Sequence, residues 1–231
     1  MNKFEKRLVD SGFVRTSLPS SSPLVVHAVP GSGKTSLLRK LITEEPTFCC
    51  FTCGQPDPPN LSGNYIHKYF QGCYRSDKFC ILDEYLLADD ISHFDIVLSD
   101  PLQCRKHQIL GAHYIKRESH RVPRSVCDFL RNLGFEIESS CEGTLNINNF
   151  FSEVDLSAVS ICIQKEVFDF CKQQNLICKF PSEVQGLEFE KVNIFVDNSS
   201  EELKSTEFYT VATRASKNLN LYLTNESKTT S

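Results

Sequence analysis

The chain has no tryptophan among its 231 residues, so any aromatic stacking on a ligand must use phenylalanine or tyrosine. Tyr65, Tyr69 and Phe70 are candidates that the sequence does not rank. The chain also lacks an apolar run near the ~20 residues that a membrane-spanning helix requires. Residues 1–7 have no apolar core like that of a secretory signal. We therefore expect a cytosolic protein with no direct membrane insertion, which reaches membranes only through a partner.

An excess of positive charge is missing as well. The formal net charge of −4 excludes a surface coated with basic residues, so any nucleic-acid site must be local. Residues 105–124 are the segment that qualifies, with six basic residues against one acid, Glu118. The basic residues are Arg105, Lys106, Lys116, Arg117, Arg121 and Arg124. The segment is either a solvated basic face or a nucleic-acid contact.

Cysteine, by contrast, is abundant, with eleven residues, an odd number. In a cytosolic chain these residues indicate reduced thiols instead of a disulfide framework. Cys49, Cys50 and Cys53 lie close together, but no second Cys or His pair follows at zinc-finger spacing. We expect a strand in which cysteine acts as a small apolar residue, and a metal site there is the weaker alternative.

The most informative segment is a glycine loop between an apolar run and a helical pattern. The loop consists of Ala28, Val29, Pro30, Gly31, Ser32, Gly33, Lys34 and Thr35. Glycines let backbone N–H groups close around phosphate oxygens, and the following helix N-terminus adds partial positive charge. Lys34 can reach the outer phosphates, and the Thr35 hydroxyl can ligate Mg²⁺. The sequence therefore predicts that these eight residues bind ATP or another nucleoside triphosphate with Mg²⁺.

One position departs from the usual loop pattern, because Ala28 stands where glycine is expected. If the backbone there needs a positive φ, alanine costs on the order of 1 kcal/mol.

Two later segments extend the nucleotide site. An apolar strand at 79–82 runs into Asp83 and Glu84, which predicts a second Mg²⁺ ligand and a general base that polarises water. A second strand at 95–98 is followed by Asp100 and Gln103. Gln103 is predicted to contact the γ-phosphate and the attacking water, and a plain Asp-Pro turn is the alternative.

The order of elements predicts an α/β protein. Strands are expected at 24–28, 47–53, 79–82 and 95–98, and again at 159–163, 176–179, 191–196 and 219–223. Helices are expected at 2–15, 36–42, 123–133, 164–174 and 207–217, with a loop at 54–64 and a disordered tail at 225–231. Strands that alternate with helices favour parallel sheets. Because the pattern occurs twice, with a break near 116–122, two small lobes are expected.

Six ordered segments resemble the motifs of superfamily 1 helicases. Ala28–Thr35, Ile81–Tyr85 and Ser99–Gln103 resemble motifs I, II and III, and Ser119–Pro123, Val184–Phe189 and Val211–Ala215 resemble motifs IV, V and VI. So compact a set is similar to the triple gene block protein 1 family of flexuous plant viruses, of the potexvirus and carlavirus type. The resemblance implies two RecA-like lobes, residues 1–117 with motifs I, Ia, II and III, and residues 118–231 with motifs IV, V and VI.

The resemblance also assigns roles in the second half of the chain. Arg121 and Arg214 are implied to reach the γ-phosphate, Gln185 to bridge nucleotide and nucleic acid, and Gly186 to allow close backbone approach. Glu188 is implied to bind a ribose hydroxyl. The alternatives are surface ion pairs for the arginines and a solvated acid for Glu188. With this context, the basic segment 105–124 is interpreted as an RNA contact.

At the level of function, the resemblance implies an RNA-binding NTPase, helicase-like, that carries viral RNA between plant cells and suppresses RNA silencing. The implied partners are single-stranded viral RNA, the two small membrane-bound movement proteins, coat protein or virions, and a second copy of the chain. The implied locations are the host cytoplasm, plasmodesmata and inclusion bodies. Two alternatives remain open: a metabolic kinase, disfavoured by the motifs after Asp100, and a binding scaffold whose ATPase fold is vestigial.

Overall fold

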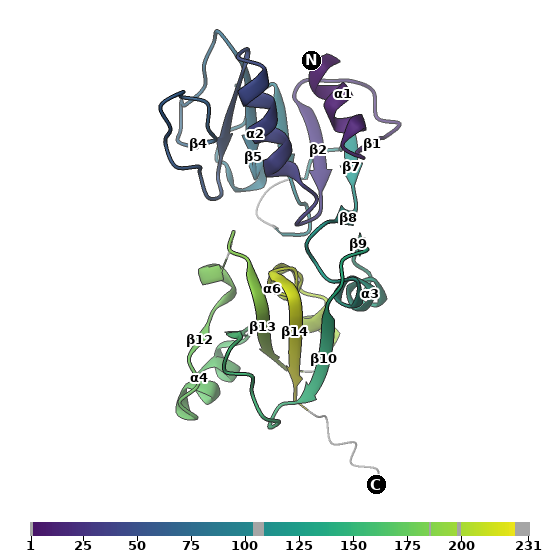
Figure 1. The fold of residues 1–231 in the computed structure, drawn as a ribbon, viewed down its shortest axis with the longest axis vertical. Helices are drawn as coiled ribbons and strands as arrows, with labels where there is room; N and C mark the ends of the chain where they lie inside the picture. Colours follow the sequence, from purple (N-terminus) through teal and green to yellow (C-terminus); the bar gives the residue numbers. More distant parts are fainter. Residues whose placement is uncertain (1, 104–108, 185, 198–199, 225–231) are drawn as a thin grey trace. The chain divides into compact units, whose positions relative to one another are not determined.

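The computed structural model describes residues 2–103, 109–184, 186–197 and 200–224. The chain divides into two compact units, Met1–Glu118 and Ser119–Ser231, each built on its own largely parallel sheet (Figure 1). The predicted α/β class is confirmed. Within the described residues, no helix is both long enough and apolar enough to cross a bilayer.

The first unit contains a seven-stranded sheet in the order β1-β7-β2-β6-β5-β3-β4. Its strands are β1 (Val14–Arg15), β2 (Leu24–Ala28), β3 (Phe48–Thr52), β4 (His67–Lys68), β5 (Phe79–Asp83), β6 (Ile96–Ser99) and β7 (Tyr114–Lys116). All neighbours run parallel except β1 and β7. The four strands predicted in this half are β2, β3, β5 and β6. Because they are central strands, their nearly continuous apolar sequences made them recognisable.

Both helices of this unit, α1 (Asn2–Asp10) and α2 (Lys34–Glu44), cover the same face of the sheet (Figure 1). Phe4 and Leu8 of α1 are fully buried against this face. The predicted helix 2–15 is too long, because Gly12 has a φ of 81° and turns the chain into β1. The opposite face is covered by the short 3₁₀ helix η1 (Tyr85–Leu87) and by loops.

The cysteines of β3 behave as small core residues. Cys49 and Cys50 are buried, and the Sγ of Cys49 lies 3.3 Å from that of Cys80 on the neighbouring strand. In the part of the chain that the structure describes, no metal-ligand group of three forms there. The prediction of a strand at 47–53 is confirmed.

The second unit contains a five-stranded parallel sheet in the order β10-β14-β13-β11-β12 and a two-stranded sheet of β8 and β9. Its strands are β8 (Glu118–Ser119), β9 (Glu138–Ser139), β10 (Thr144–Asn149), β11 (Val159–Cys162), β12 (Cys178–Lys179), β13 (Phe189–Val196) and β14 (Ala215–Leu223). Strand β10 was not predicted, since its polar sequence has low strand propensity. It forms because all six of its residues pair with β14.

The helical segments of the second unit are α3 (Arg124–Asn132), α4 (Lys165–Gln173), η2 (Pro181–Val184), α5 (Ser200–Leu203) and α6 (Thr206–Ala212). The predicted helix 207–217 is wrong in its second half. Helix α6 ends at Ala212, and the N–H of Phe189 donates to the carbonyl of Arg214 (3.0 Å), which begins the pairing of β13 with β14. This early end places Arg214 in the turn between α6 and β14.

Candidate functional site

The glycine loop joins the carboxyl end of β2 to the first turn of α2. Gly31 has a φ of 72° and Gly33 a φ of 91°, so both need the left-handed region that side chains disfavour. Gly33 is also the residue that immediately precedes helix α2. The loop is thus a strand-to-helix turn whose N–H groups lie at a positive helix end.

Ala28 lies in ordinary strand conformation. It is the last residue of β2 and pairs with Lys116 of β7. Glu84 and Asn175 are the non-glycine residues with positive φ among those described, so Ala28 carries no such strain. The cost considered for alanine at this position therefore does not arise.

The side chain of Lys34 is held inside the glycine loop by carbonyl groups of the loop backbone. Its Nζ donates to the carbonyl oxygens of Ala28 (2.7 Å) and Val29 (3.2 Å), and the residue is 8% exposed. Both acceptors are neutral, and an anionic oxygen makes the stronger bond to an ammonium group. The lysine is therefore positioned for an anion that enters the loop.

Asp83 ends strand β5 and is buried at 6% exposure, and its Oδ1 has no hydrogen-bond partner. Burial, reinforced by the charge of Glu84, raises the pKa of Asp83 to about 7, while Lys34 acts in the opposite direction. A buried carboxylate with no partner for one of its oxygens is poorly stabilised by the protein. A cation at this position would supply what is missing.

Glu84 follows directly in a strained backbone conformation. Its φ of 56° lies in the left-handed region, and its Oε2 accepts a long hydrogen bond from Ser99 Oγ at 3.4 Å. Strain of this kind costs about 1–3 kcal/mol and tends to occur at functional sites. Because the backbone turns at Glu84, the side chains of Asp83 and Glu84 point in different directions. This arrangement suits two carboxylates with separate roles.

Sequence reasoning missed His27, which lies in β2 beside this group. Its Nε2 lies 3.0 Å from the hydroxyl of Tyr85, and burial together with the charge of Lys34 lowers the pKa of His27 to about 4. Near neutral pH the imidazole of His27 is therefore neutral, and the Asp83 carboxyl binds a proton more readily than an exposed aspartate does. No sequence signal distinguishes His27 from an ordinary strand residue, because its role depends on the side chains packed around it.

After β6 the chain forms a tight turn. Asp100 is 1% exposed, and its Oδ1 accepts from the N–H of Leu102 (3.0 Å) while its carbonyl accepts from the N–H of Gln103 (3.2 Å). The Asp-Pro turn considered as an alternative is therefore present. It fixes the backbone of Gln103 beyond the end of β6, and the role of the Gln103 side chain stays a prediction.

In the second unit, residues of the three later motifs come together around Arg121. Its Nη1 forms an ion pair with Glu188, its Nη2 donates to the carbonyl of Thr213 (3.0 Å), and its Nε has no partner. Glu188 is half exposed, so the pair is partly solvated. Within this unit, Glu188 is therefore the ion-pair partner of Arg121.

Arg214 is buried at 4% exposure in the turn after α6. Its Nε donates to the carbonyl of Thr210 (3.2 Å) and its Nη1 to that of Leu187 (3.5 Å). The neighbouring Gly186 has a φ of 78°, which a side chain would strain. Gln185 lies outside the described residues.

Buried polar atoms without a partner are concentrated at these predicted positions. In the described part of the chain they are Ser32 Oγ, Asp83 Oδ1, Arg121 Nε and Gln164 Nε2. Proteins satisfy nearly all such atoms, so each exception calls for a reason. Three of the four belong to residues of motifs I, II and IV, namely Ser32, Asp83 and Arg121.

The basic segment is only partly a surface. Lys116 lies in β7 at 7% exposure, its Nζ donates to the carbonyl of Ser11 (2.9 Å), and burial lowers its pKa. Interpreting Lys116 as an RNA contact was therefore wrong, because strand pairing turns it inward. His113 is also buried, and its Nδ1 accepts from the N–H of Val25 (2.9 Å). Arg117 and Arg124 are exposed, whereas 105–107 lie outside the described residues.

The three candidate stacking residues differ in exposure. Tyr69 packs against the core of the first unit, and Tyr65 lies against the ring of His67 with centroids 4.1 Å apart. Phe70 is 64% exposed. Phe70 is therefore the one of the three with a face open to a base.

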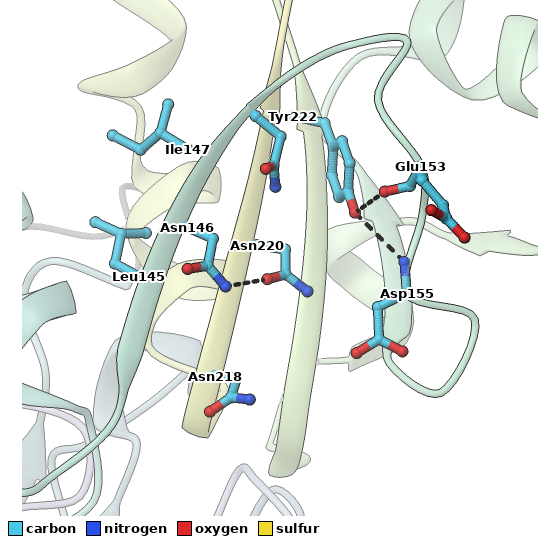
Figure 2. A pocket seen from close by; sticks show the side chains of 9 residues that line it. Leu145, Asn146, Ile147, Glu153, Asp155, Asn218, Asn220 and Tyr222 are labelled. Atoms are coloured by element: carbon cyan, nitrogen blue, oxygen red, sulfur yellow. Dashed lines mark hydrogen bonds between the residues drawn. The ribbon is translucent and has the colours of Figure 1, made fainter.

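A polar cavity of about 570 Å³ lies on the sheet of the second unit (Figure 2). Asparagines in register on neighbouring strands line it, and Asn146 Nδ2 donates to Asn220 Oδ1 (2.9 Å). Glu153 and Asp155 also line it. Their negative charge disfavours a phosphate, and none of the predicted site residues lines this cavity.

Replacing Asp83 with asparagine should stabilise the nucleotide-free protein by about 4 kcal/mol at pH 8 and about half as much at pH 5. The folded-state pKa of about 7 lies above the ordinary value of 3.8, so this group's contribution to stability is lost as pH rises between those values. Urea unfolding at both pH values measures the effect.

The exposed Asp89→Asn is the control and should change the unfolding free energy by less than about 0.5 kcal/mol. The pH dependence of the wild-type unfolding free energy does not show this effect alone. The pKa of His27 is lowered from 6.5 to about 4, so the contribution of His27 to stability is lost as pH falls through the same window, which opposes the contribution of Asp83. Equal changes at both pH values in Asp83→Asn would contradict the assignment.

Comparison with known proteins adds a sequence match and a structural match. Residues 24–223 match the model of the viral superfamily 1 RNA helicase core domain. The chain is 39% identical over 207 residues to the movement and silencing protein TGBp1 of Apple stem pitting virus (isolate PA66), covering 90% of this chain and 92% of that protein. It is 35% identical over 210 residues to TGBp1 of Papaya mosaic potexvirus, covering 90% and 87%.

Among solved structures, a complex of the Arterivirus nonstructural protein 10 (helicase) with DNA matches with a TM-score of 0.55 at 16% identity. The match covers 98% of this chain and 58% of that helicase, so the chain spans somewhat more than half of its length. At this identity the likeness concerns the fold.

Proposed function

This chain belongs to the viral superfamily 1 RNA helicase core family and is a relative of the TGBp1 movement and silencing proteins, and from this membership we propose that it is an RNA-binding NTPase. In this proposal it hydrolyses ATP or another nucleoside triphosphate and supports the transport of viral RNA between plant cells. Suppression of host RNA silencing is proposed with it, on the names of its relatives.

The observation that carries the proposal is the set of unpartnered buried polar atoms on Ser32, Asp83 and Arg121. A hydroxyl, a carboxylate oxygen and a guanidinium N–H are the groups that a triphosphate and its cation would satisfy. A vestigial fold, the alternative of a binding scaffold, would have no need to keep such atoms unsatisfied, since each costs about 1–3 kcal/mol.

In the first unit, the loop N–H groups and Lys34 would bind the phosphates. Thr35 and Asp83 would hold Mg²⁺, and they fit it because both offer hard oxygen ligands and one Asp83 oxygen lacks any partner. Bound Mg²⁺ supplies positive charge against the phosphate oxygens. Glu84 would accept a proton from the attacking water, and Gln103 would orient that water.

In the second unit, Arg121 and Arg214 would contact the γ-phosphate, where a guanidinium fork matches the charge on the transferring group. Both are now held by carbonyl oxygens, and Arg121 also by Glu188. Contact with a phosphate would exchange these acceptors for anionic oxygens. Glu188, once released by Arg121, would accept a hydrogen bond from a ribose hydroxyl. Gly186 would allow close backbone approach, and Gln185 would bridge nucleotide and nucleic acid.

The RNA contacts in this proposal are Phe70 and Arg117 of the first unit and Arg124 of the second, all of which are exposed. Further partners proposed from the family are the two small membrane-bound movement proteins, coat protein or virions, and a second copy of the chain. The proposed location is the host cytoplasm, with plasmodesmata and inclusion bodies.

The test of the function is release of inorganic phosphate from Mg²⁺-ATP, with and without single-stranded RNA. We expect turnover that RNA stimulates, because the proposed function binds both ligands in one helicase-like cycle. A protein that binds RNA but releases no phosphate under either condition would be a scaffold, and turnover that ignores RNA would indicate a kinase-like enzyme.

The double variant Arg117→Ser/Arg124→Ser should weaken binding of single-stranded RNA and make its salt dependence shallower. Losing two phosphate contacts should reduce the slope of log K against log salt by about 1.4. Fluorescence anisotropy at several salt concentrations measures this slope.

Its matched control is Lys6→Ser/Lys172→Ser, which removes the same charge from exposed positions, one in each unit. The control should leave the slope unchanged. If the two double variants behave alike, RNA binds elsewhere.

A further inference from the structure

Three cysteines of the second unit lie together, outside every motif described above. Cys162 ends strand β11, Cys171 lies in α4 and Cys178 begins β12. Their Sγ atoms are all within 4.8 Å of one another. Cys162 and Cys171 are buried and Cys178 is half-buried.

The local fold explains why they meet. Strand β11, helix α4 and strand β12 form one parallel crossover, in which Ser160 pairs with Cys178. Cys171 lies in the C-terminal half of α4, and its carbonyl accepts from the N–H of Leu176 (3.0 Å), which turns the chain back toward the sheet. Sequence analysis missed the group because its spacing, with eight and then six intervening residues, is not that of a zinc finger.

The geometry is close to that of a thiolate metal site. Zn–S bonds of about 2.3 Å in a tetrahedron require S···S separations of about 3.8 Å. The three Sγ atoms lie within 4.8 Å, so small side-chain movements would bring each to a shared ion. In the described residues, no other group of three His, Cys, Asp or Glu side chains meets this condition.

We propose that Cys162, Cys171 and Cys178 bind a Zn²⁺ ion as three thiolates. The described residues add no fourth His, Cys, Asp or Glu ligand to the group, so water or another small donor completes the tetrahedron. The half-buried side of Cys178 is where that fourth ligand enters. Zn²⁺ neither gains nor loses electrons, so binding needs no redox co-reactant, and the thiols release their protons as they bind the ion.

The surrounding packing shows what such an ion would hold. Strand β12 has only two residues and lies at the edge of the sheet, next to Ile177, which is 89% exposed. The apolar cluster between α4 and the sheet is small, with Val167, Phe195 and Tyr222 among its members. An ion bound by all three elements would fasten α4 and β12 to β11, since binding to the folded state alone adds to stability.

The experiment measures metal content in the full chain, expressed with zinc and purified without chelator. We expect about one zinc per chain in wild type by mass spectrometry of the digested protein. Cys171→Ser and the less buried Cys178→Ser should hold almost none. The matched control is Cys49→Ser, which changes a buried thiol of the first unit that lies beside Cys80 and should keep its zinc.

Cobalt titration of the metal-free wild type gives a second measurement that needs no variant. Three thiolates should produce an intense near-ultraviolet charge-transfer band, whereas Co²⁺ at an oxygen site such as Thr35 and Asp83 would give only weak absorption. Zinc near zero in wild type and no thiolate band would overturn the proposal. Neither measurement involves nucleotide or RNA, so the result is independent of the proposed NTPase function.

Discussion

Lys34→Ala is expected to lower the turnover of Mg²⁺-ATP by at least about a hundredfold, to the background of the assay. The Lys34 ammonium lies in the glycine loop, with its Nζ 2.7 Å from the carbonyl oxygen of Ala28. Removing it takes away the point charge that would neutralise the outer phosphates.

The same substitution should act on Asp83. The charge of Lys34 opposes the rise in the pKa of Asp83, so its removal would keep that carboxyl group protonated to higher pH. A protonated Asp83 is a poor Mg²⁺ ligand, because metal ligands must give up their protons. Loss of Lys34 would therefore weaken both the proposed phosphate site and the proposed cation site.

Release of phosphate measured with malachite green at saturating Mg²⁺-ATP checks this prediction. Lys40→Ala is the matched control, because Lys40 lies in the same helix and is exposed. It should leave turnover unchanged. Unaltered hydrolysis by Lys34→Ala, in a protein that folds normally, would remove the glycine loop from the mechanism.

Arg214→Ala is expected to slow hydrolysis by about a thousandfold while it changes nucleotide affinity much less. The reason is that the guanidinium, in the proposed contact with the transferring phosphoryl group, would stabilise charge that develops mainly in the transition state. Titration with a fluorescent nucleotide measures affinity, and single-turnover phosphate release measures the rate.

A structural role for Arg214 has to be separated from this one. The side chain is 4% exposed and donates to the carbonyls of Thr210 and Leu187, so its truncation also leaves buried acceptors unpaired. Arg214→Lys keeps a charge and a donor but not the planar fork. It should preserve thermal stability better than Arg214→Ala and still hydrolyse slowly. Weak binding with normal turnover in Arg214→Lys would argue against a contact with the γ-phosphate.

The chain by itself determined the first unit's central strands and the glycine loop. These depend on neighbours in sequence: a continuous apolar run forms a buried strand, and glycine followed by Lys34 and Thr35 forms a strand-to-helix turn. Asp83 could be recognised for the same reason, as the polar residue that ends such a run. The ordered later motifs indicated the family without any coordinates.

Only the tertiary structure decided what depends on contacts between distant segments. Pairing of β7 with β2 buries Lys116 and puts Ala28 in relaxed strand conformation, and pairing with β14 makes a strand of the polar segment Thr144–Asn149. The raised pKa of Asp83 follows from burial and the charge of Glu84, against the opposing charge of Lys34, and the lowered pKa of His27 follows from burial and the charge of Lys34. The cysteine cluster likewise exists only because the β11–α4–β12 crossover brings three thiols together. The number of residues between the cysteines does not by itself predict how close their side chains lie in the folded chain.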